Sequence, residues 1–373
     1  KRQLVDIGVG EQRLASLSRP ERELVEDTFR VLSIGFSYME GADTIDAFFQ
    51  QNGSPSYGYV IYANLGDLYL EKERFVDAAE TYEAFVAQDP LHRQSPLLQA
   101  KVIESYKQGG FPTLVLGGKK HFVERYGMDS AFWQRNPIDQ NAEVAAHLRS
   151  HLTDLAQYYH AEAQRDGNKS DYQQAADWYR KYLAYFPDDD DSANTNFLLA
   201  EILFESEDYE QATSEYERTA YGYIDHEKSA EAGFAAILSY REHEKNLTGA
   251  DRADWHERYL DAGLKFADTF AEHPQSGAVL TTVAEDLFVQ RQFDRAIAVG
   301  QAVVSKRPPV DANLARTAWT VIAHSQFDLG HFAEAEGAYY SLRTATPVSD
   351  AAAAQEIKDR IASSIYKQGE QAR

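Results

Sequence analysis

The chain has 373 residues, a formal net charge of −22 at pH 7 and no cysteine. This length is enough for two ordinary domains or for one extended repeat array. The absence of cysteine excludes disulfides and Cys-ligated metals, and the acidic balance argues against nucleic acid, whose phosphates require a basic face. No apolar run reaches the roughly 18 residues of a spanning helix, so we expect no membrane span. An acidic surface instead favours basic or apolar partner segments.

The N-terminal region, residues 1–56, is expected to hold a leader followed by an atypical helical pair. Pro20 suits the first turn of a helix, where a missing N–H removes no hydrogen bond. The segment 21–40 is amphipathic, and 44–51 has the length of a shorter partner helix.

The stretch 62–90 has the clearest local pattern in the chain. Apolar or small residues recur there at the spacing of one helix face, first at Tyr62, Leu65, Gly66 and Tyr69, and then at Phe75, Ala78, Ala79, Tyr82 and Phe85. Gly66 and Ala78 lack bulk where two helices would cross closely, and Pro90 closes the second helix. Neither helix can bury its apolar face alone, so the pair requires neighbours.

This spelling resembles the tetratricopeptide repeat (TPR), which places an aromatic residue, Leu-Gly, Tyr, Ala, a second aromatic and Pro over about 34 residues. Those places are held by Tyr62, Leu65, Gly66, Tyr69, Ala78, Tyr82 and Pro90. The resemblance covers nearly all of residues 57–347. It implies an all-α fold, a TPR-type α-solenoid built as a right-handed superhelix of antiparallel helix pairs, with about seven pairs.

Interruptions of the repeat suggest the division of the chain. We expect a TPR unit plus a degenerate repeat in 57–127, a linker (131–137) and a long-helix TPR-like pair in 128–190, TPR units with an insertion near 241–255 in 191–347, and a capping helix or the start of a further repeat in 348–373. The second-helix alanines that mark the repeats are Ala78, Ala175, Ala212, Ala262, Ala296 and Ala335. The start at Lys1 and the repeat-like tail together predict a fragment of a longer TPR protein.

Motifs for catalysis are incomplete, so we expect no catalytic, cofactor-binding or metal site and no enzyme. A phosphate loop fails at 113–120, because Thr113 replaces its first glycine and Lys120 its Ser or Thr. The acidic run 188–191 lacks the spacing of a calcium loop and is expected to favour the helix that follows it. Three His-Glu dipeptides do not extend to HExxH and are expected on exposed segments: His226-Glu227, His243-Glu244 and His256-Glu257.

A partner groove is implied by the resemblance, because the first helix of each TPR pair lines a concave face. The residues beside the packing positions are Asp67 and Leu70; Phe197, Glu201 and Phe204; Thr281, Glu285 and Phe288; and Thr320, His324 and Phe327. The clamp of chaperone-binding TPRs for a peptide's terminal carboxylate is absent, because acids occupy its places. We expect a groove for basic or apolar segments; the alternative is that these phenylalanines pack against the next repeat.

A basic cluster of Lys119, Lys120 and Arg125, with His121 beside them, stands out in the acidic chain. Residues 121 and 125 share a helix face. The cluster is expected either to dock an acidic partner, or an acidic surface of this same chain, or to form a solvated face with nearby acids.

The sequence thus predicts a non-enzymatic protein-protein interaction scaffold that binds other proteins or peptides, with no cofactor and no nucleic acid. Repeat ends such as YFPDDDDS and the phrase FVERYG resemble TPR proteins of Gram-negative cell envelopes, which implies a periplasmic or outer-membrane-associated protein; a cytoplasmic one is the alternative. Two other functions stay open. One is a regulatory or substrate-binding part of a larger enzyme, and the other is a glycan- or peptidoglycan-binding module that uses Tyr57, Tyr59, Tyr158, Tyr159, Tyr221 and Tyr223.

Overall fold

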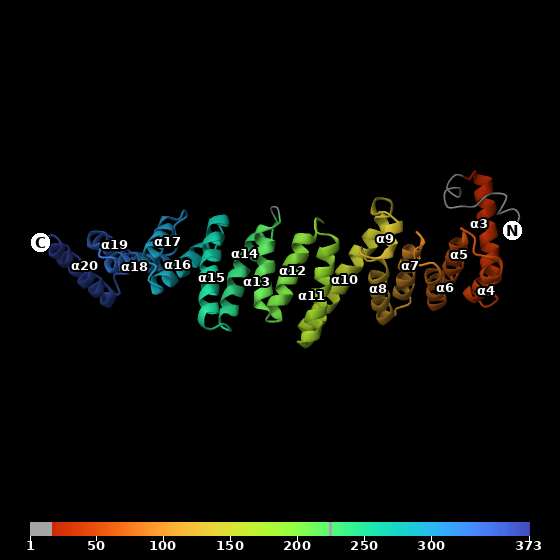
Figure 1. Ribbon diagram of the computed structural model, residues 1–373, viewed down its shortest axis with the longest axis horizontal. Coiled ribbons are helices and arrows are strands. Elements are labelled where there is room, and N and C mark those ends of the chain that lie inside the picture. The colour runs from red at the N-terminus through yellow and green to blue at the C-terminus, as the bar shows by residue number, and fades with distance from the viewer. Residues whose placement is uncertain (1–16, 224–225) are drawn as a thin grey trace. The chain divides into compact units, whose positions relative to one another are not determined.

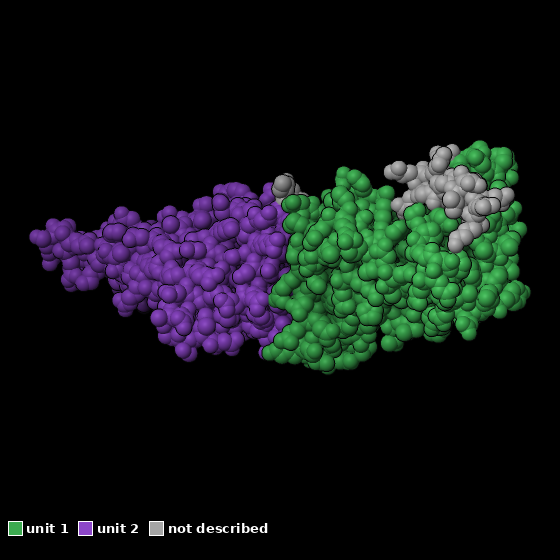
Figure 2. Space-filling model, turned by 45° about the vertical axis from the view of Figure 1, so that its right-hand side comes forward, with its two compact units in different colours: residues 1–192 green, residues 193–373 purple. Residues whose placement is uncertain are grey.

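The computed structural model describes residues 17–223 and 226–373, so most of the expected leader lies outside the described residues. Within these ranges the chain forms α-helices and one short 3-10 helix, without a strand (Figure 1). The all-α prediction is therefore confirmed. The chain divides into two compact units, residues 1–192 and 193–373 (Figure 2).

Unit 1 contains the irregular part of the repeat array. Its elements are α3 (Arg19–Ser37), α4 (Ala42–Asn52), α5 (Gly58–Glu71), α6 (Phe75–Gln88), α7 (Ser95–Gln108), α8 (Pro112–Tyr126), α9 (Ala131–Arg135), η1 (Ile138–Gln140), α10 (Ala142–Asp166) and α11 (Lys169–Tyr185). Pro20 lies in the first turn of α3, as expected.

Unit 2 is more regular. Its elements are α12 (Ser192–Glu205), α13 (Tyr209–Tyr221), α14 (Ser229–Glu244), α15 (Gly249–Thr269), α16 (Ser276–Val289), α17 (Phe293–Ser305), α18 (Ala312–Asp328), α19 (Phe332–Ala345) and α20 (Ala351–Gln371). Each helix from α13 to α19 packs against the next one in the chain. The tail is the single helix that the sequence predicts, and α20 packs on α19.

The turn inside five helix pairs has one geometry. It is three residues long between α5 and α6, α7 and α8, α12 and α13, α16 and α17, and α18 and α19. The middle residue has a positive φ in every case: Glu73, Gly110, Glu207, Arg291 and Gly330. So short a reversal forces the two helices to run antiparallel and in contact. Each unit is therefore a stack of TPR-type antiparallel pairs, which confirms the predicted fold class.

Close helix crossing explains the small residues of the repeat. A Cβ atom added to Gly66 would lie 2.3 Å from the ring of Tyr82. Both Tyr82 and Ala78 are fully buried in α6. The interpretation of Gly66 and Ala78 as packing positions is thus confirmed.

Two segments differ from their expected form. The expected linker 131–137 contains the short helix α9, because Phe132 is fully buried against Tyr126, with ring centroids 5.4 Å apart. The insertion near 241–255 lengthens α14 and α15 and leaves only 245–248 between them. Trp255 anchors this extension, since its indole N–H donates to the carbonyl of Tyr240 at 2.9 Å.

None of the helices within 17–223 and 226–373 has the length and apolarity required to cross a membrane. The right-handed superhelix concerns how the two units are placed relative to one another and stays a prediction.

Candidate functional site

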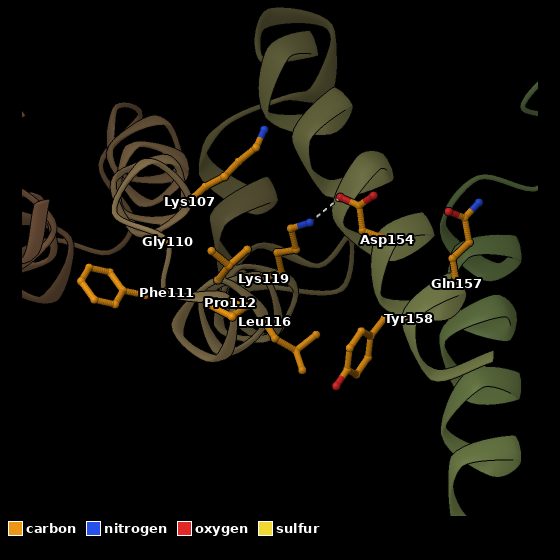
Figure 3. A pocket seen from close by; sticks show the side chains of 10 residues that line it. Lys107, Gly110, Phe111, Pro112, Leu116, Lys119, Asp154, Gln157 and Tyr158 are labelled. Carbon is orange, nitrogen blue, oxygen red and sulfur yellow. Dashed lines mark hydrogen bonds and ion pairs between the residues drawn. The ribbon is translucent and has the colours of Figure 1, made fainter. Parts of the chain in front are cut away.

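The best-formed depression in unit 1 lies around α8. Its first part, called here the apolar hollow, has a volume of about 600 Å³. Phe111, Pro112 and Leu116, from the start of α8, and Tyr158, from α10, provide its apolar surface (Figure 3). The ring of Phe111 is 37% exposed and that of Tyr158 42%, so both remain accessible to a partner.

Glycines determine where Phe111 lies. Gly110 adopts a φ of +74°, a conformation that glycine takes without strain, and this lets α7 end and α8 begin within three residues. A Cβ on Gly109 would lie 2.5 Å from the Phe111 ring, so glycine is also needed for the ring to fold back over the turn.

An ion pair separates the apolar hollow from a second depression. Lys119 Nζ lies 2.6 Å from a carboxylate oxygen of Asp154, and the lysine side chain is only 20% exposed. Figure 3 shows this pair at the edge of the apolar hollow. Because Lys107, Lys119 and Asp154 line both depressions, the two adjoin each other. We call them together the α8 cleft.

The second part, the polar hollow, has a volume of about 550 Å³. Lys101 and Glu104 line it from α7, and Glu143, His147 and His151 line it from α10. His151 is buried, and neither ring nitrogen has a hydrogen-bond partner within the described ranges. Burial, followed by His147 and Lys119, lowers the pKa of His151 to about 4, so its imidazole is neutral at pH 7.

Most charges of the polar hollow are balanced within the chain. Lys101 Nζ contacts Asp67 at 2.7 Å, and Lys107 lies 3.8 Å from Glu104. Glu143 is exposed, and no ion pair joins it to any residue that the structure describes. A basic group that enters this hollow would therefore meet Glu143.

The predicted groove residues divide between the units. In unit 1, Asp67 accepts hydrogen bonds from Tyr82 Oη at 2.6 Å and from Lys101 Nζ, while Leu70 is half-buried. Asp67 is thus engaged inside the chain, and its partners are the second helix of its own pair and the first helix of the next.

In unit 2 most predicted groove residues pack against aromatic rings. Phe197 is buried against Tyr216, Phe204 contacts Tyr209 and Tyr216, Phe288 contacts Phe293 and His324, and Phe327 contacts Phe332. Glu201 accepts a hydrogen bond from the hydroxyl of Tyr216. Thr281 is buried, and Glu285 is exposed. Thr320 and His324 come together in a small cavity of about 160 Å³. This packing fits the alternative for the phenylalanines, and the partner groove stays a prediction.

The predicted basic cluster is dispersed into separate contacts. Lys119 pairs with Asp154, and the ammonium of Lys120 lies 4.9 Å from the centre of the Tyr159 ring. Arg125 Nη1 contacts Glu83 at 2.6 Å and Gln99 at 2.8 Å. Each cation thus has a partner inside unit 1, and the docking of an acidic partner stays a prediction.

Three histidines cap first helices, a role that the sequence interpretation missed. Nδ1 of His92, His226 and His273 accepts the backbone N–H two residues later, at 3.1 or 3.2 Å, just before α7, α14 and α16. The recurrent spelling His-x-Gln/Lys-Ser, at 92–95, 226–229 and 273–276, is the signal that could have revealed it. Asp189 holds this place before α12, where it accepts the N–H of Asp191 at 3.3 Å, in line with the expectation for the acidic run.

The His-Glu dipeptides have other structural roles. His256 Nδ1 lies 3.0 Å from Glu244, whose side chain is only 14% exposed, so the expectation that these residues are exposed is wrong here. The cause is the lengthening of α14 and α15, which brings the two side chains together. Among the described residues no group of three or more His, Cys, Asp or Glu has metal-binding geometry.

The helix pairs, their turns and their buried small residues define an all-α protein of stacked TPR-type pairs. No family model matches the chain, and no curated protein matches it. It is similar to a solved TPR2AB-domain:pHSP90 complex of yeast Sti1, with 15% identity, a TM-score of 0.33 and coverage of 83% of this chain and 99% of that one. A tetratricopeptide repeat protein from Parabacteroides merdae has 12% identity, a TM-score of 0.28 and coverage of 82% and 98%.

A third similar structure is the C-terminal part of a TPR repeat-containing protein from Cytophaga hutchinsonii. It has 10% identity, a TM-score of 0.29 and coverage of 78% of this chain and 98% of that one. At these identities and TM-scores the matches add nothing to the fold assignment, which rests on the chain's own helix pairs.

Proposed function

We propose that the chain is a non-enzymatic scaffold for protein-protein interaction, which binds a segment of a partner protein in the α8 cleft. The observation that carries the proposal is the pair of adjoining hollows on either side of Lys119 and Asp154. Binding sites are typically concave, mainly apolar and equipped with a few placed polar groups. The α8 cleft has this form in unit 1.

The chemistry of the cleft favours a partner segment with an apolar side chain followed by a basic one. The apolar side chain would fill the apolar hollow between Leu116 and Tyr158. The basic one would reach the polar hollow and meet Glu143. The net charge of −22 supports this choice, because an acidic surface attracts basic segments and repels acidic ones.

The experiment is selection of a random peptide library on the intact chain, followed by affinity measurement with the selected peptides. We expect sequences that pair apolar with basic residues. Tyr158→Ser and Glu143→Lys should each weaken binding about tenfold or more, which corresponds to about 1.4 kcal/mol.

Matched controls are Tyr38→Ser, at an 84% exposed tyrosine of α3, and Glu124→Lys, at an exposed glutamate of α8 that lines neither hollow. Both controls should bind as the unsubstituted chain does. Selection of acidic peptides, or equal affinity of the cleft and control variants, would refute the proposal.

We also propose a place in a bacterial cell-envelope complex. The support is the spelling of the repeat ends, such as YFPDDDDS at 185–192, which resembles envelope TPR proteins. Fractionation of cells that express the native protein tests it, and recovery in the cytosol alone would contradict it.

A further inference from the structure

A tyrosine-carboxylate hydrogen bond recurs inside the helix pairs. In α5 and α6 the hydroxyl of Tyr82 donates to Asp67 at 2.6 Å, fifteen residues earlier in the chain. In α12 and α13 the hydroxyl of Tyr216 donates to Glu201 over the same separation of fifteen residues. The equivalent positions of the two pairs thus hold the same bond, which gives a buried hydroxyl a charged acceptor.

The pair α18 and α19 has the tyrosine but lacks the carboxylate. Tyr339 occupies the tyrosine position, and fifteen residues earlier the chain has His324, whose ring lies 5.7 Å away. Tyr339 is only 1% exposed, and its hydroxyl has no hydrogen-bond partner among residues 17–223 and 226–373. Burial, and then the charge of Arg360, lowers the pKa of His324, which keeps this imidazole neutral at pH 7. A buried hydroxyl without an acceptor is costly, so the position is one acceptor short.

The unsatisfied hydroxyl lies at a cavity of about 160 Å³, which we call the α20 notch. Arg316 lines it from α18, and Glu356 and Arg360 line it from α20. Arg316 reaches the amide oxygen of Asn313 only at 3.4 Å, and within the described ranges neither arginine forms an ion pair. Two guanidinium groups therefore face one carboxylate, which leaves a single positive charge in an acidic chain.

We propose that the α20 notch binds one carboxylate group of another molecule. The hydroxyl of Tyr339 donates to this carboxylate, and Arg316 and Arg360 balance its charge. The bound group thereby takes the place that Asp67 and Glu201 hold in the other pairs. A carboxylate fits better than a phosphate, because the single excess positive charge matches a monoanion and Glu356 repels a dianion. The notch lies in unit 2 and does not depend on the α8 cleft of unit 1.

The test is calorimetric titration of the intact chain at pH 7 and constant ionic strength with three probes. N-acetyl-glutamate α-amide offers a side-chain carboxylate, N-acetylglycine offers a terminal carboxylate, and inorganic phosphate is the competing anion. We expect saturable binding of at least one carboxylate probe to one site, with phosphate weaker. The stronger of the two carboxylate probes identifies the source as a side chain or a chain terminus.

Variants locate the binding in the notch. Tyr339→Phe and Arg360→Gln should each weaken the carboxylate probe about tenfold. The controls are Tyr340→Phe, at the neighbouring exposed tyrosine, and Lys358→Gln, at an exposed cation of α20 outside the notch, and both should bind normally. Unchanged binding by Tyr339→Phe, or tighter binding of phosphate than of either carboxylate, would overturn the proposal.

A gain of function provides a second and independent check. His324→Glu introduces the carboxylate that Glu201 supplies to Tyr216. We expect this variant to unfold at a higher urea concentration than the unsubstituted chain and to lose affinity for the carboxylate probes, because its own side chain fills the notch. A variant that folds and still binds the probe would show that the hydroxyl of Tyr339 is not the acceptor-seeking group. Peptide binding at the α8 cleft should be unaffected, so failure of either proposal can be told apart from failure of the other.

Discussion

Two glycines in the middle of helices should respond oppositely to the same substitution. Gly66 of α5 and Gly117 of α8 are both helical, so replacement by alanine gains about 1 kcal/mol of helix propensity at either site. At Gly117 the new methyl group meets nothing within 4 Å. Gly117→Ala should therefore raise the free energy of unfolding by about 1 kcal/mol.

At Gly66 the new methyl group would lie 2.3 Å from the ring of Tyr82, well inside van der Waals contact. The ring cannot move aside easily, because it is fully buried and its hydroxyl is bonded to Asp67. Overpacking of this kind costs about 1 to 3 kcal/mol, and the upper part of that range applies to an immobile ring. After the gain in propensity, Gly66→Ala should lower the free energy of unfolding by about 1 to 2 kcal/mol.

Urea unfolding of the intact chain, followed by far-ultraviolet circular dichroism, measures both variants against the unsubstituted protein. The difference between the two variants should be about 2 to 3 kcal/mol. If Gly66→Ala is as stable as Gly117→Ala, α5 and α6 do not cross as closely as the structure shows, and the explanation of Gly66 as a packing position is wrong.

Three further outcomes are expected in the same unfolding assay. Gly330→Ala should cost about 1 to 2 kcal/mol, because the φ of +79° is strained for alanine; no loss would contradict the turn geometry. The free energy of unfolding should fall as the pH drops from 6.5 to 4, because the unfolded chain protonates His151 first, and the loss should reach about 3 kcal/mol; an undiminished pH dependence in His151→Leu would exclude this residue as its source. Tyr216→Phe should cost about 1 to 2 kcal/mol by removing the donor to Glu201, and an unchanged stability would show that this bond contributes nothing.

The helix pairs could be predicted because their signal is local. Apolar residues at helix spacing, together with Gly66 and Ala78 at the crossing, specify both the helices and their close approach. The turns could not be predicted in the same way. Glu73, Glu207 and Arg291 adopt positive φ although none of them is a glycine, so the usual spelling of such a turn is missing.

The candidate site was predictable only in part. Lys119 stood out as a cation in an acidic chain, but its partner Asp154 lies 35 residues further along. Their contact depends on how α10 packs on α8, and periodicity along one helix does not determine that. The Phe111 and Tyr158 side chains of the apolar hollow come from the same packing, so the hollow has no signature in the sequence.

The two proposed sites arise where the repeat departs from its own rule. Where a pair is complete, as in α5 and α6, the tyrosine hydroxyl and the first-helix carboxylate satisfy each other and present no vacant group. In α18 and α19 the carboxylate is replaced by His324, and a donor is left over beside a cavity. Between α8 and α10 the short elements α9 and η1 replace the usual brief connection, and the α8 cleft lies beside this irregular join. Regular repeats build the stack, and binding requires groups that the stack does not satisfy, so individual function in such a chain belongs to its irregular positions.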